Sequence, residues 1–204
     1  MNTKLIIIEG LDNTGKTTLI NRLTKVFDLT NKIHEHDLSY EKITYKIIHM
    51  HKPPTNITDN DEANLYQQKV YNDIINELQE LCGKYTYIFL DRAWLSEYVY
   101  GQLYRNRNKL EIVENNIAIE NEILAMFNQN VYLLYLTADI EFIMLNEDGN
   151  SLSANDRDLI TKETICFDDI FNMSLIYNKV RIPVCNANLE FIDILPKVYT
   201  YITF

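Results

Sequence analysis

The chain has 204 residues and a mass of 24.1 kDa, the size of a single α/β domain with room for a small lid. Hydrophobic residues make up 47% of it and charged residues 24%, a balance that excludes wholesale disorder. Lysines and arginines number 19 against 29 aspartates and glutamates, a net charge of −10. This sign excludes a protein whose main task is to bind duplex nucleic acid or an anionic membrane surface.

The apolar runs and the helical spacings alternate along the whole chain. In chain order we expect a strand at 4–9, a helix at 16–27, a strand at 45–51, a helix at 61–81, a strand at 85–90, helices at 94–104 and 111–127, a strand at 131–136, a helix starting at 139–145, a helix at 164–179, a strand at 181–185 and a helix at 189–201. Residues 28–44 carry no clear pattern. Apolar strands that alternate with helices predict an α/β fold with a parallel five-stranded sheet and helices on both faces.

The segment 147–158 is polar and contains Gly149, Asn150 and two serines, so we expect a mobile surface segment there. We therefore describe 1–204 as one domain with a lid segment at about 146–160.

The three cysteines form no CxxC pair, which indicates a reducing compartment. There is neither a signal peptide pattern nor an apolar stretch long enough to span a bilayer, so we expect a soluble, cytoplasmic protein, in the host cytoplasm if the chain is viral.

The strongest motif is the run from Gly10 to Thr17, GLDNTGKT, which matches G-x-x-x-x-G-K-[ST] between an expected strand and an expected helix. Glycines let backbone N–H groups converge on phosphate oxygens, and the start of the helix adds its positive dipole end. Lys16 reaches the outer phosphates, and the Thr17 hydroxyl can bind Mg²⁺. The residues expected to hold the donor phosphates are Gly10, Asn13, Thr14, Gly15, Lys16, Thr17 and Thr18.

This motif and a second one resemble the thymidylate kinase family. Residues 8–18 (IEGLDNTGKTT) are similar to the family's E-G-x-D-x-x-G-K-[ST]-T loop, and residues 91–100 (DRAWLSEYVY) to its D-R-[YFH]-x-x-S-x-x-[AV]-[YF] segment. Residues 52–55 (KPPT) and 155–157 (NDR) stand at the places of its acceptor turn and its lid pair. The run 94–105 is most similar to thymidylate-kinase-like proteins of bacteriophages. The resemblance implies a P-loop NTPase fold and the transfer of phosphate from ATP, with Mg²⁺, to a nucleoside monophosphate, dTMP by default.

The resemblance also implies the residues that bind this acceptor. Asp12 would hold the sugar 3′-hydroxyl, although an Asx turn is the alternative. Arg92 would bridge the donor and acceptor phosphates with its guanidinium fork. Tyr100 would pack under the sugar, where a plain core position is equally compatible with the pattern. The remaining residues expected on the acceptor side are Lys52, Ser96, Glu97 and Arg105.

For catalysis, the resemblance implies Lys16, Arg92 and a lid arginine, Arg157. The phosphate loop itself supplies no arginine, and phosphoryl transfer needs positive charge at the transferred group in the transition state. The alternative for Arg157 is an exposed charge among acidic neighbours. Thr17 and Asp91 are the expected Mg²⁺ residues, because Asp91 ends an apolar strand beside the loop.

Three departures from the family pattern concern the acceptor, and the last two leave its base open. Lys52 replaces an arginine that grips the acceptor phosphate, so a point charge stands where a bidentate fork is expected. Gln67 and Tyr71 stand near the places of the aromatic residue and the arginine that contact thymine. Glu97 introduces a carboxylate near the base, which would favour a base edge that offers N–H donors.

Two alternatives remain at this point. A deoxynucleoside kinase would phosphorylate a 5′-hydroxyl and needs a general base, for which Glu9 is the candidate. The second alternative is a non-catalytic nucleotide-binding module or a GTPase-like switch, although the sequence after Asp91-Arg92 contains no N-K-x-D motif that would bind guanine. The four histidines, at 34, 36, 49 and 51, offer no third ligand for a zinc site. We expect ATP and a nucleoside monophosphate as partners, without stable nucleic acid or membrane binding, and the resemblance implies a homodimer.

Overall fold

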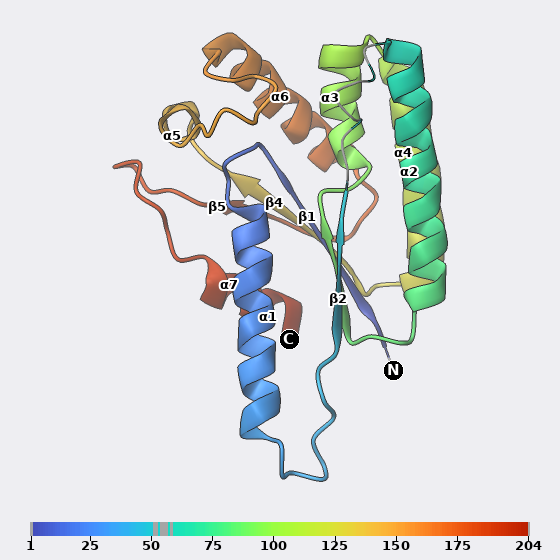
Figure 1. Cartoon of the computed structure of the whole chain (residues 1–204), viewed down its shortest axis with the longest axis vertical. Coiled ribbons are helices and arrows are strands. Elements are labelled where there is room, and N and C mark those ends of the chain that lie inside the picture. Colours follow the sequence, from blue (N-terminus) through green and yellow to red (C-terminus); the bar gives the residue numbers. More distant parts are fainter. Residues whose placement is uncertain (1, 51–52, 54–56, 58, 204) are drawn as a thin grey trace.

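In a computed structural model, which describes residues 2–50, 53, 57 and 59–203, five parallel strands form one sheet in the order β2-β3-β1-β4-β5 (Figure 1). The strands are β1 (Lys4–Gly10), β2 (Tyr45–His49), β3 (Tyr87–Asp91), β4 (Val131–Thr137) and β5 (Asn178–Pro183). Every pairing between neighbours is parallel. The predicted fold class, a parallel five-stranded sheet in an α/β protein, is confirmed.

Helices cover both faces of this sheet. Figure 1 shows α1 (Lys16–Ile33) and α7 (Leu195–Thr203) on one side, and α2 (Asn60–Leu81), α3 (Leu95–Arg105) and α4 (Lys109–Phe127) on the other. The short α5 (Ile140–Leu145) leads to α6 (Arg157–Met173), which packs against α3. None of the helices in these described ranges is long and apolar enough to cross a bilayer.

The core is centred on β1, the middle strand. Its residues 5–8 are fully buried because helices cover both faces of the sheet at this position. On the α1 side, Phe27 is fully buried and stacks on Tyr87 of β3, with ring centroids 4.7 Å apart. This packing holds α1, and with it the loop that precedes the helix, firmly against the central strands.

Several predicted boundaries were wrong. The first helix continues to Ile33, beyond the predicted end at 27. The helix predicted at 164–179 begins seven residues earlier, because the Asp156 carboxylate caps it by accepting from the N–H groups of Asp158 and Leu159. It ends at Met173, so β5 begins at 178 instead of 181. The last helix begins at Leu195, since the preceding residues form a bridge between Cys185 and Phe191.

The polar segment between α5 and α6 is organised around one carboxylate, that of Glu147. It accepts hydrogen bonds from Gly149 N (2.8 Å) and Ser151 Oγ (2.5 Å). It also accepts one from Asn13 Nδ2 at 3.2 Å, which ties the segment to the loop after β1. The segment expected as a lid therefore contacts the phosphate loop in this structure.

Candidate active site

The loop between β1 and α1 has the conformation that its sequence requires. A side chain at Gly10 would place its Cβ 2.5 Å from the carbonyl oxygen of Leu136, and Gly15 has a φ of +79°, a conformation that favours glycine. Helix α1 begins directly after Gly15 without a side-chain cap. The first N–H groups of the helix have no partners within the helix, so they are available to an anion at this end.

Lys16 points into this loop. Its side-chain Nζ donates hydrogen bonds to the carbonyl oxygens of Gly10 (3.1 Å) and Leu11 (2.5 Å). Burial and, to a smaller extent, the nearby positive charge of Arg92 lower the pKa of Lys16 to about 7. A phosphate group beside this ammonium would favour its charged form, so the loop is well suited to a polyphosphate.

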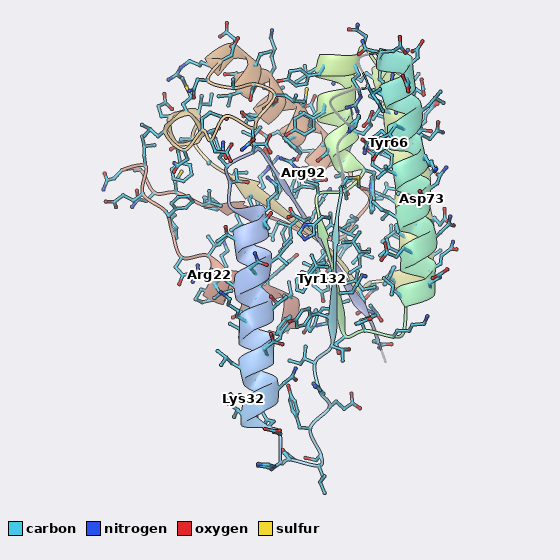
Figure 2. The ribbon with its side chains drawn as sticks, in the orientation of Figure 1. Arg22, Lys32, Tyr66, Asp73, Arg92 and Tyr132 are labelled. Carbon is cyan, nitrogen blue, oxygen red and sulfur yellow. The ribbon has the colours of Figure 1, made fainter. Side chains whose placement is uncertain are left out.

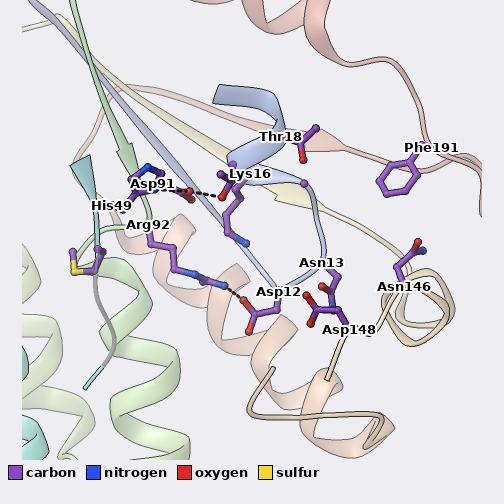
Figure 3. A pocket seen from close by; sticks show the side chains of 13 residues that line it. Asp12, Asn13, Lys16, Thr18, His49, Asp91, Arg92, Asn146, Asp148 and Phe191 are labelled. Atoms are coloured by element: carbon purple, nitrogen blue, oxygen red, sulfur yellow. Dashed lines mark hydrogen bonds and ion pairs between the residues drawn. The ribbon is translucent and has the colours of Figure 1, made fainter. Parts of the chain in front are cut away.

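A cavity of about 550 Å³ opens over the loop, and we call it the donor pocket (Figure 3). Besides the loop residues, it is lined by the ends of β2 and β3 and by three residues from the far side, Asn146, Asp148 and Phe191. Phe191 packs edge-on against Phe142, with ring centroids 4.6 Å apart. An aromatic ring at the mouth of a phosphate-binding pocket is suited to contact the base of a nucleotide.

A divalent cation would find two oxygen ligands beside the loop. Asp91 Oδ2 accepts a hydrogen bond from Thr17 Oγ1 at 2.5 Å and lies 3.1 Å from His49 Nδ1. Within the described residues there is no group of three or more His, Cys, Asp or Glu side chains that could hold a metal. The residues present fit Mg²⁺, which usually takes one or two protein oxygens and completes its shell with phosphate and water.

Arg92 follows β3 directly and lies between the loop and α3 (Figure 2). Its backbone is left-handed, with a φ of 69°, and is held by a bond from its N–H to Ile8 O (3.0 Å). The guanidinium forms an ion pair with Asp12, donates to Gly10 O at 3.1 Å and lies 5.3 Å from the ring centre of Tyr100. Burial would lower the pKa of Arg92, but Tyr100 and the nearby carboxylates raise it above its usual value, so it stays charged.

Glu9 holds the turn that carries Arg92. It is 2% exposed, and its carboxylate accepts hydrogen bonds from Ala93 N (2.7 Å) and Ser96 Oγ (2.8 Å). Burial raises the pKa of Glu9, while Arg92 acts in the opposite direction. Ser96, expected to touch the acceptor, thus also links Glu9 to the first turn of α3, and its Oγ accepts from Arg92 Nη1 at 3.4 Å.

A second cavity of about 600 Å³, the acceptor pocket, lies between α2, α3 and the segment after α5. Its wall is more apolar and aromatic than that of the donor pocket, with Tyr71, Tyr100 and Tyr104 among the lining residues. The two pockets share five lining residues: Asp12, Asn13, Met50, Arg92 and Asp148. Arg92 and Asp12 therefore stand at the junction between the two pockets.

Tyr100 lines the acceptor pocket, and its hydroxyl is buried without a hydrogen-bond partner among the described residues. Burial raises the pKa of Tyr100 above its usual value, so the hydroxyl is neutral and keeps its proton. The centre of the Tyr100 ring lies 6.2 Å from that of Tyr104 and 6.1 Å from that of Phe167. The residue thus combines both interpretations from the sequence, a packed aromatic ring and a lining residue with a polar end.

Glu97 differs from the expectation that its carboxylate faces the base as an acceptor. It is 3% exposed, and Oε2 accepts from the Tyr71 hydroxyl (2.9 Å) and from Arg105. Oε1 accepts from Arg107 Nη1 at 3.3 Å. Protein donors thus occupy both oxygens of Glu97, and Glu97 and Arg105 both line the acceptor pocket.

Of the expected residues that the structure describes, Gly10, Thr14 and Arg157 do not appear in the lining of either pocket. Arg157 is the first residue of α6, is about half exposed and forms an ion pair with Glu141 at 2.6 Å. It is absent from the described lining of both pockets. Lys52, expected at the acceptor phosphate, lies outside the described residues, as does His51.

The sequence reasoning missed other lining residues. Met50 and Asp148 line both pockets, Tyr104 lines the acceptor pocket and Phe191 the donor pocket. Met50 directly follows β2, and the carboxyl ends of parallel strands meet at one edge of the sheet. Its place in the sequence could therefore have indicated that Met50 lies at the site. Phe191 gives no such signal, because it reaches the pocket through a bridge to Cys185 that no local pattern reveals.

The parallel sheet, the glycine-containing loop after its central strand and the Asp91–Thr17 pair define a phosphate-loop nucleotide-binding protein with a second pocket beside that loop. The sequence profile described as thymidylate kinase matches residues 8–141 of this chain. The chain belongs to the thymidylate kinase family.

Individual relatives agree with this. A thymidylate kinase of Blochmanniella floridana is 28% identical over 116 residues, which cover 54% of this chain and 55% of the relative. The chain thus spans about half the length of that curated relative. Among solved structures, the thymidylate kinase of Candida albicans has a TM-score of 0.62 at 18% identity, covering 98% of this chain and 91% of that one. That of Ehrlichia chaffeensis has a TM-score of 0.60 at 12% identity, covering 98% and 96%. At these identities the structures support the fold.

Proposed function

We propose that this protein transfers the γ-phosphoryl group of ATP, with Mg²⁺, to a nucleoside monophosphate, with dTMP as the default acceptor. The observation that carries the proposal is the junction of the two pockets at Arg92 and Asp12. One pocket has the phosphate loop, and the other has an aromatic wall suited to a nucleoside. Phosphoryl transfer needs this arrangement, because donor and acceptor must meet in line.

The chain's own residues would act mainly by positioning and by charge. Lys16 and the N–H groups at the start of α1 hold the donor phosphates. Mg²⁺, when bound at Thr17 and Asp91, supplies charge neutralisation at the phosphate oxygens. The Arg92 guanidinium lies between the pockets and can contact phosphate oxygens of both ligands. Asp12, its partner, is then available to the acceptor sugar.

We also propose that residues 146–160 act as a lid and that Arg157 reaches the transferred group when the lid closes. This movement would exchange the exposed ion pair with Glu141, which is worth little, for contacts with phosphate. The bond between Asn13 and Glu147 shows that the segment already contacts the phosphate loop. Closure would exclude water, which otherwise would hydrolyse ATP.

The deoxynucleoside kinase alternative is less well supported. Its general base would be Glu9, but both carboxylate oxygens of Glu9 accept hydrogen bonds from the turn after β3. Glu9 does not appear in the described lining of either pocket. As partners we propose ATP and the monophosphate alone, without stable nucleic acid binding, and a homodimer, which sedimentation at assay concentration would test.

The experiment compares dTMP with thymidine as acceptors while ADP release is measured in a coupled assay. We expect turnover of dTMP, and loss of turnover by at least about a hundredfold in Arg92→Gln, since a transition-state charge contact is removed. Arg181→Gln is the matched control, because Arg181 is exposed on β5 and pairs with Asp168 away from the pockets. Turnover of thymidine alone, or an Arg92→Gln variant as active as the control, would refute the proposal.

A further inference from the structure

A histidine at the end of β2 lies beside the carboxylate of the proposed Mg²⁺ site. His49 and Asp91 are paired in the register of the neighbouring parallel strands β2 and β3. Paired residues of adjacent strands direct their side chains to the same face of the sheet, so both side chains leave the sheet together where the strands end. The hydrogen bond from Met50 N to Asp91 O, at 3.1 Å, continues this pairing. Figure 3 shows the His49 ring beside Asp91 at one side of the donor pocket, which both residues line.

The two carboxylate oxygens of Asp91 have different surroundings. Oδ2 lies 3.1 Å from His49 Nδ1 and also accepts from Thr17 Oγ1. Oδ1 has no hydrogen-bond partner among the residues that the structure describes. The side chain of Asp91 is 8% exposed, and that of His49 is 52% exposed. A nearly buried carboxylate is thus held at one oxygen by two groups, while its other oxygen remains for a ligand of the donor pocket.

The direction of the contact follows from the chemistry of the two groups. An ionised carboxylate only accepts hydrogen bonds, and a neutral imidazole donates from one nitrogen and accepts at the other. His49 therefore carries its proton on Nδ1 and donates it to Asp91, which leaves Nε2 as an acceptor. Nε2 has no partner among the described residues, and an acceptor at this place repels phosphate oxygens. The ring is thus suited to act on Asp91 and not on the phosphates.

The geometry points to His49 as a positioning residue of the Mg²⁺ site, which holds Asp91 Oδ2 and so leaves Oδ1 for the cation or for one of its water molecules. This inference rests on the proposed function, because it takes Mg²⁺ to bind together with the nucleotide at Thr17 and Asp91. A group that hydrogen-bonds a metal-binding side chain fixes its orientation, and the loss of such a group typically weakens metal binding by about 10- to 100-fold.

The test compares the affinity for ADP with and without Mg²⁺, measured by calorimetry on the full chain. The ratio of the two affinities is the gain that the metal provides, and contacts that act on ADP alone cancel from it. We expect His49→Val, which suits a strand but has no donor, to lower this gain about tenfold. Its affinity for ADP without Mg²⁺ should stay unchanged, and because a misfolded protein would not bind ADP, this measurement also checks the fold.

His49→Asn is the conservative variant. The asparagine Nδ2, like the histidine Nδ1, is bonded directly to Cγ, so this variant can still donate to Asp91 and should keep most of the gain. His34→Val is the matched control, because His34 stacks on Tyr40, with ring centroids 4.6 Å apart, and lies outside the described lining of both pockets. It should keep the gain in full.

The inference is overturned if His49→Val keeps the full gain, if it loses affinity for ADP equally with and without Mg²⁺, or if His49→Asn loses the gain as completely as His49→Val. An unmodified protein whose affinity for ADP does not depend on Mg²⁺ would overturn it as well. In turnover with dTMP, His49→Val should need about ten times more Mg²⁺ for half-maximal activity and should recover its rate when Mg²⁺ is saturating.

The binding measurement separates this inference from the proposed function, since it needs no acceptor. If Mg²⁺ raises the affinity for ADP and His49→Val loses this gain, but no monophosphate is phosphorylated, the role of His49 holds and the proposed activity fails. Turnover of dTMP by a His49→Val variant whose need for Mg²⁺ is unchanged has the opposite meaning.

Discussion

The substitution Glu9→Gln tests how the turn after β3 positions Arg92. Glu9 accepts one hydrogen bond from Ala93 N and one from Ser96 Oγ, and both are strengthened by its charge. A glutamine of the same size keeps one neutral acceptor oxygen, for Ala93 N, and places an NH₂ donor at the other position, where Ser96 Oγ must accept instead of donate. The loss is about 1 kcal/mol for each bond. If the whole loss of about 2 kcal/mol appears as weaker stabilisation of the transition state by Arg92, kcat/KM drops about 30-fold.

The stability of the protein should change much less. Burial raises the pKa of Glu9, which means that its charged form is costly inside the protein, and glutamine removes this cost. Glu120→Gln is the matched control, since Glu120 is 2% exposed and accepts from Ser174 Oγ (2.8 Å) and Leu175 N (2.5 Å) far from the pockets. Burial raises the pKa of Glu120 as well.

The assay is coupled ADP release with dTMP, alongside urea unfolding of both variants. We expect Glu9→Gln alone to lose activity, while the free energy of unfolding of both variants stays within about 1 kcal/mol of the unmodified protein. Full activity in Glu9→Gln would refute the reasoning, as would an equal loss in Glu120→Gln.

Three further predictions concern the donor pocket. The pKa of Lys16 is lowered to about 7, and a bound phosphate would raise it, so ATP binding at pH 8 should take up protons. The affinity for ATP should therefore fall as the pH rises above 7. Calorimetry in buffers of different ionisation enthalpy measures the proton uptake. Asp91→Asn should raise the Mg²⁺ concentration for half-maximal activity at least about tenfold, because a neutral amide replaces the carboxylate beside Thr17, and a Mg²⁺ titration checks it. Gly10→Ala should lower ATP affinity and the unfolding midpoint together, by about 2 kcal/mol in stability, because its Cβ would meet Leu136 O at 2.5 Å; a variant with unchanged urea unfolding would contradict it.

The elements that the sequence predicted best are those with a purely local cause. Residues 5–8 form an unbroken apolar run because both faces of β1 are covered, and such a run identifies a central parallel strand. The phosphate loop is equally local, since two glycines, a lysine and a threonine at fixed spacing suffice. The start of α6 was missed although its cap, Asp156, is a typical signal, because a polar segment surrounds it and obscured where the helix begins.

The acceptor pocket shows what could not be derived from the sequence. Residue types alone placed Glu97 near the base, but its partners Tyr71 and Arg105 come from α2 and from two turns further along α3. Which polar atom of such a cluster remains for a ligand depends on these tertiary contacts. Residue types alone therefore indicated a carboxylate in this wall, but not that Tyr71, Arg105 and Arg107 donate hydrogen bonds to it.

The position of Arg92 follows from the order and register of the strands. Ile8 of β1 pairs with Asp91 of β3, so the phosphate loop and Arg92 leave neighbouring strands at nearly the same level. The backbone of Arg92 then turns back at a φ of 69°, a conformation that costs a non-glycine residue about 1 kcal/mol. The bond from Arg92 N to Ile8 O and the bond from Ala93 N to Glu9 compensate this cost. A shift of the register by one residue would move the guanidinium by about 3 Å, more than a phosphate contact tolerates. The position of the Arg92 guanidinium relative to the phosphate loop thus depends on the pairing of two central strands.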